Sequence, residues 1–235
     1  MSRPNLSGTA AGLLVFLGLV ILVGVLAYLP ARAAPSASCS DGNFPTRVED
    51  DATVSGDLYV TDDIMVRNET TLTITAESHI TICGEYQQRV ENGTLVASGT
   101  ETDPILFDAD DPSTRWENIF IIGISSMGEN VIEHVELNNG GGNDETALTG
   151  AIHIRNYYDS PGAYPLVKDV TINDSGAFGL VVESDGYDDE TPPALSGLTI
   201  NNSARAPMLL DVAAVGGLGQ GNTFTGNVTN TIQVG

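Results

Sequence analysis

The feature that most constrains the fold of this chain is a set of short apolar runs that recur in its second half. Three of these runs align without gaps: VIEHVELNNG, LVKDVTINDS and ALSGLTINNS. Two of the aligned columns hold apolar residues in every copy: Val135, Val170 and Leu198 in the first, and Leu137, Ile172, Ile200 and then Phe224 in the second. A repeat of this kind indicates copies of one structural unit stacked on one another.

A second apolar series follows the first at a constant distance. Eight residues after the second column, it gives the alternating pairs Leu180/Val182, Met208/Leu210 and Ile232/Val234. The earliest matching pair, Ile152/Ile154, lies 15 residues after Leu137. The spacing along the second column shrinks from 35 to 28 to 24 residues, because later copies contain fewer inserted residues. The glycine-rich residues 140–144 form one such insertion in the first copy. Such a repeat predicts a solenoid, because each coil buries its apolar side only against its neighbours. A leucine-rich repeat has a similar period, but its leucine spacing and helical half are missing here, so an all-β parallel β-helix fits better.

Asparagine follows the second apolar column in three successive copies. These residues are Asn138, Asn173 and Asn201, and Thr225 takes the same position in the fourth copy. Amides stacked at one turn of successive coils can hydrogen-bond along the stack. We therefore interpret them as a structural asparagine ladder rather than as catalytic groups.

The N-terminal segment has the pattern of an export signal. Arg3 precedes an uncharged, almost wholly apolar run over residues 10–30, and the small-x-small site Ala31-Arg32-Ala33 follows. This pattern is typical of a cleaved signal peptide, but the run approaches the ~20 residues that span a bilayer, so an uncleaved anchor is the alternative. We divide the chain into a signal peptide or membrane anchor (1–33), an N-terminal linker or cap (34–53) and the β-helix (54–235), which is secreted or held at the cell surface.

Cys39 and Cys83 are the two cysteines of the chain. Outside the cytoplasm an isolated pair is most simply a disulfide, with two buried free thiols as the alternative. The sequence has no CxxC motif and no Cys/His cluster, which argues against zinc and thiol-redox chemistry.

The charge of the chain excludes one large class of partners. Nine Lys and Arg residues stand against 31 Asp and Glu residues, a formal net charge of −22 at pH 7. Such a surface repels nucleic acid and anionic lipid, because it cannot neutralise their phosphates. We expect no nucleic-acid partner, and contact with a membrane only through an uncleaved N-terminal segment.

The segment GTLVASGTETDPILFDADDPSTRWENIFI, with VIEHVEL and the glycine run after it, resembles right-handed parallel β-helix repeat proteins of the pectate-lyase-like superfold, especially secreted bacterial and archaeal surface forms. The matching positions are Gly93, Leu95, Ala97, Gly99, Thr100, Pro104, Ile105, Phe107, Trp116 and Ile119. The resemblance covers about residues 50–235 and implies a right-handed, single-stranded solenoid. It implies no single function, because the superfold carries lyases, hydrolases and adhesins.

The chain departs from the catalytic members of that superfold. Their pectate lyases carry an Arg or Lys base and an Asp cluster that holds calcium, whereas this chain has the single lysine Lys168 and no row of carboxylates at its outward strand positions. The Asp pairs and Gly-His-Gly-like turn of the polygalacturonases are also missing. We expect no catalytic residues and a non-catalytic binding or structural role, adhesin-like or in the envelope. A polysaccharide lyase or glycoside hydrolase acting on an extracellular glycan is the alternative.

Candidate ligand-binding residues are the aromatic and arginine side chains that suit sugars, since aromatic rings stack on sugar faces and arginine hydrogen-bonds hydroxyls or carboxylates. They are Trp116, Arg155, Tyr157, Tyr158 and Tyr187. Trp116 also belongs to the fold block, which favours packing against a coil edge. The expected partner is an extracellular glycan or a component of the cell envelope.

Two acidic loops hold candidate calcium ligands, because calcium prefers clustered oxygen donors. The residues are Asp108, Asp110 and Asp111 in one loop and Asp185, Asp188 and Asp189 in the other. Neither loop has the spacing of an EF-hand or of a glycine-rich calcium repeat, so solvated loops are the alternative. No other cofactor is expected.

The three histidines are expected to be ordinary solvated side chains. His79, His134 and His153 each alternate with apolar residues, so each should point away from the core. His134 and His153 belong to different apolar series and should therefore face different sheets.

The C-terminal coil is expected to contact something else. Phe224, Ile232 and Val234 still fit the apolar series, and Gly235 follows at once. An end of a β-helix exposes the interior of a coil and unpaired strand edges unless a cap covers them. We expect this end to meet a further domain, a partner chain or a second copy of the chain.

Overall fold

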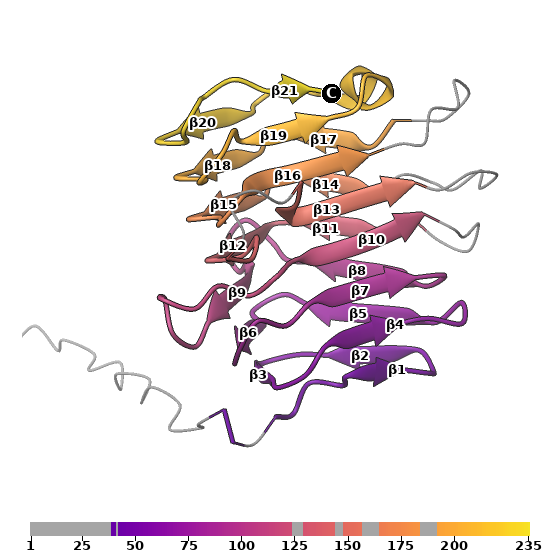
Figure 1. Cartoon of the computed structure of the whole chain (residues 1–235). Helices are drawn as coiled ribbons and strands as arrows, with labels where there is room; N and C mark the ends of the chain where they lie inside the picture. Colours follow the sequence, from indigo (N-terminus) through magenta and orange to yellow (C-terminus); the bar gives the residue numbers. More distant parts are fainter. Residues whose placement is uncertain (1–38, 41, 124–128, 144–147, 157–164, 184–191) are drawn as a thin grey trace, which may run out of the picture. The chain divides into compact units, whose positions relative to one another are not determined.

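The computed structural model describes residues 39–40, 42–123, 129–143, 148–156, 165–183 and 192–235. Residues Ala37–Gly235 form one compact unit that is built almost wholly of short strands (Figure 1). The predicted leader, residues 1–33, lies outside the described residues. Within the described part of the chain, no helix is long and apolar enough to cross a membrane.

The strands form three parallel sheets, which the chain visits in turn. Sheet A contains β1 (Arg47–Val48), β4 (Ile64–Val66), β7 (Gln88–Glu91), β10 (Ile119–Gly123), β13 (Gly150–Asn156), β16 (Phe178–Glu183), β19 (Met208–Leu210) and β21 (Gln233–Val234). Sheet B contains β2 (Ala52–Val54), β5 (Thr71–Thr75), β8 (Thr94–Ser98), β11 (Val131–Glu133), β14 (Leu166–Lys168) and β17 (Ala194–Ser196). Sheet C contains β3 (Asp57–Val60), β6 (His79–Ile82), β9 (Ile105–Ala109), β12 (Val135–Asn138), β15 (Thr171–Asn173), β18 (Thr199–Asn201) and β20 (Thr223–Thr225). The described residues therefore have an all-β, solenoid-type architecture of stacked coils.

The register of the sheets confirms the apolar columns read from the sequence. In sheet C, Leu137 pairs with Ile172, Ile172 with Ile200, and Ile200 with Phe224. In sheet A, the pairs at the head of the second series are aligned in the same way: Ile152 with Leu180, and Leu180 with Met208. Each column therefore stacks one inward residue per coil, as a period-2 strand pattern requires.

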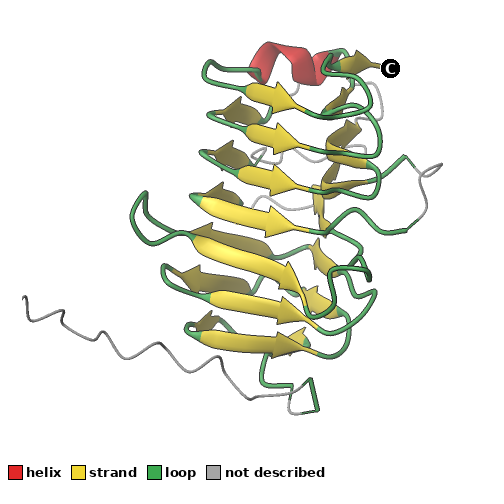
Figure 2. Cartoon of the chain, turned by 90° about the vertical axis from the view of Figure 1, so that its left-hand side faces the viewer, coloured by secondary structure: helices red, strands yellow, loops and turns green. Residues whose placement is uncertain are grey.

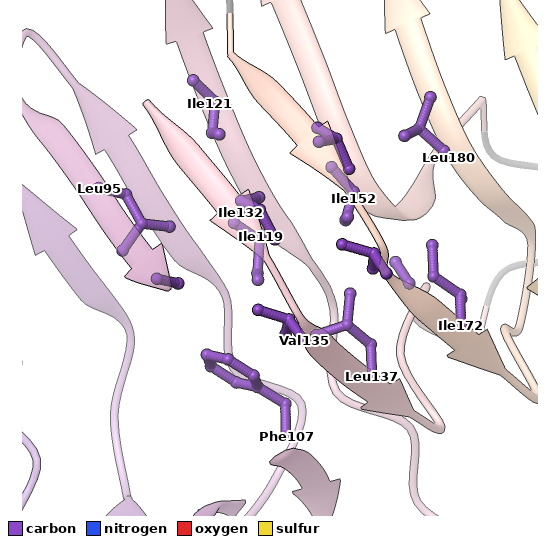
Figure 3. Packing of buried hydrophobic residues seen from close by; sticks show 14 of the residues in the cluster. Leu95, Phe107, Ile119, Ile121, Ile132, Val135, Leu137, Ile152, Ile172 and Leu180 are labelled. Carbon is purple, nitrogen blue, oxygen red and sulfur yellow. The ribbon is translucent and has the colours of Figure 1, made fainter. Parts of the chain in front are cut away.

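Inward side chains from all three sheets meet in one continuous core. Figure 3 shows Leu95 and Ile132 from sheet B, Phe107 and Leu137 from sheet C, and residues of sheet A pointing into the same interior. The labelled side chains are between 0% and 2% exposed, so the interior of the coils is closed to solvent. Burial of this apolar surface is the main stabilising contribution, because each large aliphatic side chain contributes roughly 1.5–3 kcal/mol when fully buried.

The N-terminal boundary lies earlier than the sequence division at residue 54. β1 already pairs with β4 in sheet A, and β2 with β5 in sheet B. The segment before β1 lies against the first strand of sheet C: the side chain of Asn43 accepts a 2.6 Å bond from the Tyr59 N–H and donates a 3.1 Å bond to the Asp57 carbonyl. Phe44 beside it is buried against the core.

The asparagine side chains at the ends of the sheet C strands are bonded in series. Asn173 Nδ2 donates to Asn138 Oδ1 at 2.9 Å, and Asn201 Nδ2 donates to Asn173 Oδ1 at 3.1 Å. Asn138 in turn donates to the carboxylate of Asp108 on β9. All the amides thus point the same way, and the ladder ends on a negatively charged acceptor.

At the C-terminal end, the last coil is not a complete copy of the others. The 3-10 helix η1 (Ala213–Gly217) follows β19, and a single bridge from Leu195 to Leu218 replaces a further strand of sheet B. Figure 2 shows η1 at this end of the stack, and its Ala214 is buried. Four valines nearby, Val212, Val215, Val228 and Val234, are 41–73% exposed. The expected contact of this end with another domain or chain stays a prediction.

One disulfide joins Cys39 to Cys83, as the isolated cysteine pair predicts. Cys83 follows β6, so the bond fastens the segment before β1 to the end of a strand in the second coil.

We expect Asn173→Ala to lower the free energy of unfolding by about 1–2 kcal/mol, because it leaves Asn138 and Asn201 without their partners in the ladder. The matched control is Thr171→Ala, which truncates an outward side chain of the same strand. Chemical denaturation of both variants measures the difference. Equal losses in the two variants would contradict a stabilising role of the ladder.

Removing the disulfide with the double substitution Cys39→Ser and Cys83→Ser should cost about 2–4 kcal/mol, because the bond closes a loop of 44 residues in the unfolded chain. Denaturation of the original chain with and without reductant should show the same loss, while the double variant should not respond to reductant. A thiol titration of the denatured, unreduced protein should find no free thiol, and two titratable thiols would refute the bond.

Candidate functional site

A pocket of about 690 Å³ opens on the outer face of sheet A, beside the beginnings of β7, β10 and β13. Its volume is within the roughly 300–1,000 Å³ that ligand pockets of proteins commonly have. The outward side chains that line it alternate with inward isoleucines: Phe120 lies between Ile119 and Ile121, and His153 between Ile152 and Ile154. Strand periodicity thus holds the core and the pocket on opposite faces of the same sheet.

The floor of the pocket is a compact aromatic and charged cluster. Phe120 pairs with His153 in the register of sheet A, and their ring centroids lie 4.7 Å apart. Arg89 and Arg155 lie over the Phe120 ring, at 5.3 and 5.6 Å from its centroid. The Nε of Arg155 donates a 2.6 Å bond to Glu183. The Phe120 ring is therefore covered and only 7% exposed.

His153 differs from its sequence expectation. It points away from the core as expected, but it is only 6% exposed and lies 3.1 Å from Glu183 through its Nε2. Burial is the main cause that lowers the pKa of His153, although Glu183 opposes this effect. His153 is therefore a buried, neutral part of the floor at neutral pH and not a solvated side chain. The sequence pattern shows which face a residue occupies, but not what covers that face.

Three polar side chains are bonded in series along one side of the pocket. Gln87 Nε2 donates to Asn118 Oδ1 at 3.0 Å, and Asn118 Nδ2 donates to Thr149 Oγ1 at 2.9 Å. Asn118 is 5% exposed, so its amide is held in one orientation. Oriented amides and hydroxyls of this kind can exchange hydrogen bonds with the hydroxyl groups of a ligand.

The glycine insertion recognised in the sequence forms another wall of the pocket. Gly141 and Gly142 have positive φ angles of 87° and 70°, which residues with a Cβ rarely adopt. The N–H of Gly142 donates a 2.9 Å bond to the carbonyl of Trp116, and that of Gly141 a 2.6 Å bond to the carbonyl of Glu117. These bonds tie the inserted loop to the segment before β10 and so fix the wall.

Trp116 supports this wall from inside. It is 0% exposed, its Nε1 donates a 2.8 Å bond to the carbonyl of Asn138, and its ring packs under Gly140. Its ring is therefore closed to a ligand, which corrects its assignment as a candidate ligand-binding residue. The packing role that its place in the fold block favours is the one observed.

The third side of the pocket is acidic. Glu85 and Glu117 both line it, and the Glu85 carboxylate accepts a hydrogen bond from Asn143 of the inserted loop. Burial is the largest cause that raises the pKa of Glu117, and the like charges of Asp63 and Glu85 raise it further. The carboxylates of Asp63 and Glu85 thus lie close enough to Glu117 to disfavour its charged form.

Arg155 is the one sequence-predicted ligand residue that the described structure brings into the pocket. Tyr157, Tyr158 and Tyr187 lie outside the described residues. Six further lining residues were not predicted from the sequence: Glu85, Gln87, Glu117, Asn118, Phe120 and His153. The insertion at residues 140–144 was the available signal, because an extra loop beside a sheet face is where a solenoid can form a concave surface.

The candidate calcium ligands of the first acidic loop do not converge. Asp108 is half-buried at the foot of the asparagine ladder, and burial raises its pKa. Asp110 is exposed, and the Asp111 carboxylate accepts bonds from the backbone and hydroxyl of Ser113, which lower its pKa. Asp185, Asp188 and Asp189 lie outside the described residues.

Among the described residues, one group of three side chains has ligand atoms within 4.8 Å of one another: Glu133, His134 and Asp169. The group lies at the turns between sheets B and C, where His134 and Asp169 both have positive φ angles. The ammonium of Lys168 already lies 2.6 Å from Glu133 and 3.5 Å from Asp169. The ammonium of Lys168 therefore already pairs with the carboxylates of this cluster. The hydrogen bond and charge of Glu133 raise the pKa of Lys168.

No family model, no curated protein and no solved structure matches this chain.

Because the chain has a net charge of −22, we expect its melting temperature to rise when NaCl is added, as screening weakens self-repulsion. The calcium hypothesis is tested by melting curves in CaCl₂ and MgCl₂ at the same ionic strength. A further rise in calcium alone would support a calcium site. Coincident curves would refute it and leave screening as the only effect.

Proposed function

We propose that this chain is a secreted or cell-surface right-handed parallel β-helix domain of the pectate-lyase-like type, and that it binds an extracellular glycan through the pocket on sheet A. The observation that carries the proposal is the pocket itself, with oriented amide, hydroxyl and carboxylate groups on its sides. The amides are those of Asn118 and Gln87, and the carboxylates are those of Glu85 and Glu117. Such groups suit a ligand with many hydroxyl groups. Amides and hydroxyls can donate to and accept from the hydroxyl groups of the ligand, and carboxylates can accept from them.

Three further features support this role. The disulfide between Cys39 and Cys83 suits an oxidising compartment outside the cytoplasm. The three parallel sheets suit the β-helix type that the sequence resembles. The net charge of −22 disfavours nucleic acid as the ligand. The contact of the C-terminal coil with a further domain or chain, and calcium binding by the second acidic loop, belong to the same proposal.

The alternative is a glycoside hydrolase acting on the same glycan, and one observation favours it. Glu117 has a raised pKa and lies beside a second carboxylate, Glu85, which is the pairing of a general acid and a partner group that glycoside hydrolysis uses. A polysaccharide lyase is disfavoured, because Arg155, the guanidinium that lines the pocket, is held by Glu183 and lies over Phe120 and so is not placed to act as a base.

Binding is tested by calorimetric titration of the full chain with neutral, amino and acidic oligosaccharides of equal length. We expect at least one class to bind with one-to-one stoichiometry. The double substitution Gln87→Ala and Asn143→Ala should weaken that binding about tenfold, because two hydrogen-bonding groups that line the pocket are lost.

The matched control is Gln220→Ala, which removes an exposed amide outside the pocket. Equal binding by the double variant, or no binding of any oligosaccharide, would contradict the proposal. Release of new reducing ends during the titration, abolished by Glu117→Gln, would favour the hydrolase alternative instead.

A further inference from the structure

The distribution of charge in the pocket distinguishes between classes of glycan. Glu85 and Glu117 face the pocket from one side, and Asp63 is close enough to Glu117 to raise its pKa. Asp63 is itself fixed there, because its carboxylate accepts a 3.0 Å bond from the backbone N–H of Gln87. The acidic side is thus built into the segments that precede β4, β7 and β10.

The described lining does not neutralise this acidic side. The two guanidinium groups near it are already paired. That of Arg155 is bonded to Glu183 through Nε at 2.6 Å and pairs with the same carboxylate through NH2, and the Nε of Arg89, which lies over Phe120, donates a 3.1 Å bond to Glu91. The other titratable nitrogen base of the lining, His153, is buried and has a lowered pKa. The described part of the pocket is therefore negative overall, in a chain that is already strongly acidic.

The described lining of the pocket offers little of the flat aromatic surface on which a neutral sugar ring would stack. Among the described lining residues, Phe120 is the only aromatic ring apart from His153, and two guanidinium groups lie over it. Its 7% exposure leaves little ring area for a ligand. Recognition by these residues must rest on hydrogen bonds and on charge.

We infer that the pocket binds an amino sugar with a free amine, and that the ammonium group of this sugar lies against the carboxylates of Glu85 and Glu117. This inference rests on the proposed glycan-binding function. The amine supplies the positive charge that the acidic side lacks, and it can donate a charge-assisted hydrogen bond to each carboxylate. The hydroxyl groups of the same sugar are then directed to Gln87, Asn118 and Thr149 on the amide side. A uronic acid is rejected, because its carboxylate would meet like charges.

The inference is tested with three disaccharides of matched size: a glucosamine disaccharide, its N-acetylated form and a galacturonic acid disaccharide. Short probes are required because an acidic chain attracts any polycation without a specific site. In calorimetric titrations at physiological salt, we expect the glucosamine disaccharide to bind at least tenfold more tightly than its acetylated form, and the galacturonic acid disaccharide not to bind.

The decisive variant is the double substitution Glu85→Gln and Glu117→Gln, which keeps the shape of both side chains and removes both charges. It should bring the affinity for the amine form down to that for the acetylated form, while binding of the acetylated form persists. The matched control is Glu49→Gln with Glu101→Gln, which removes two exposed carboxylates outside the pocket and should preserve the preference. Thermal melting of both double variants checks that they fold.

The possible failures are distinguishable. Equal affinity for the amine and acetylated disaccharides, or a preference that survives Glu85→Gln with Glu117→Gln, overturns the inference and leaves glycan binding intact. Preferred binding of the galacturonic acid disaccharide also overturns the inference alone. Absence of binding by all three disaccharides, and by the longer oligosaccharides, overturns both the inference and the proposed function.

Discussion

The parallel register of successive coils is the constraint on which the rest of this structure depends. Once Leu137 pairs with Ile172 and Ile172 with Ile200, every inward residue must have an apolar counterpart at the same place in the next coil. Extra residues can then be accommodated only at the turns, because an insertion within a strand would reverse the two faces of the sheet. The pocket follows from this restriction. The Gly141–Gly142 wall is an insertion at a turn, while the strands beneath it keep their spacing.

The features that recur in every coil could be predicted from the sequence, whereas the pocket, which occurs once, could not. The apolar columns and the run of Asn138, Asn173 and Asn201 are visible because stacking demands the same residue type in each coil. The pocket residues Glu117 and His153 have no such counterparts, and their environment depends on side chains from neighbouring coils that lie far away in the sequence. Periodicity assigned His153 to the outer face correctly. It could not show that Phe120 and Glu183 bury the ring there.

Trp116 illustrates how one residue can link the fold to the pocket. As part of the fold block it fills the space beneath Gly140, and its indole donates to the carbonyl of Asn138, the first member of the asparagine ladder. Its own carbonyl accepts the Gly142 N–H that holds the pocket wall. An aromatic residue in a sugar-binding pattern can thus act on a pocket without touching the ligand, which explains why residue type alone misassigned it.

The disulfide between Cys39 and Cys83 would have a mechanical consequence if the chain were tethered through the segment before Cys39. Tension applied to the chain before Cys39 passes through the sulfur atoms directly to Cys83, and so bypasses the 44-residue interval that contains β1 to β6. The first two coils carry no load, and peeling of strands from the tethered end must begin at β7 or beyond. The opposite end has no such covalent bypass among the described residues, because β21 is held there by its pairing with β19 and by the packing of Ile232 against the core. In such a tethered chain, a pulling force would leave the first two coils folded, whereas the distal strand β21 would have no comparable protection.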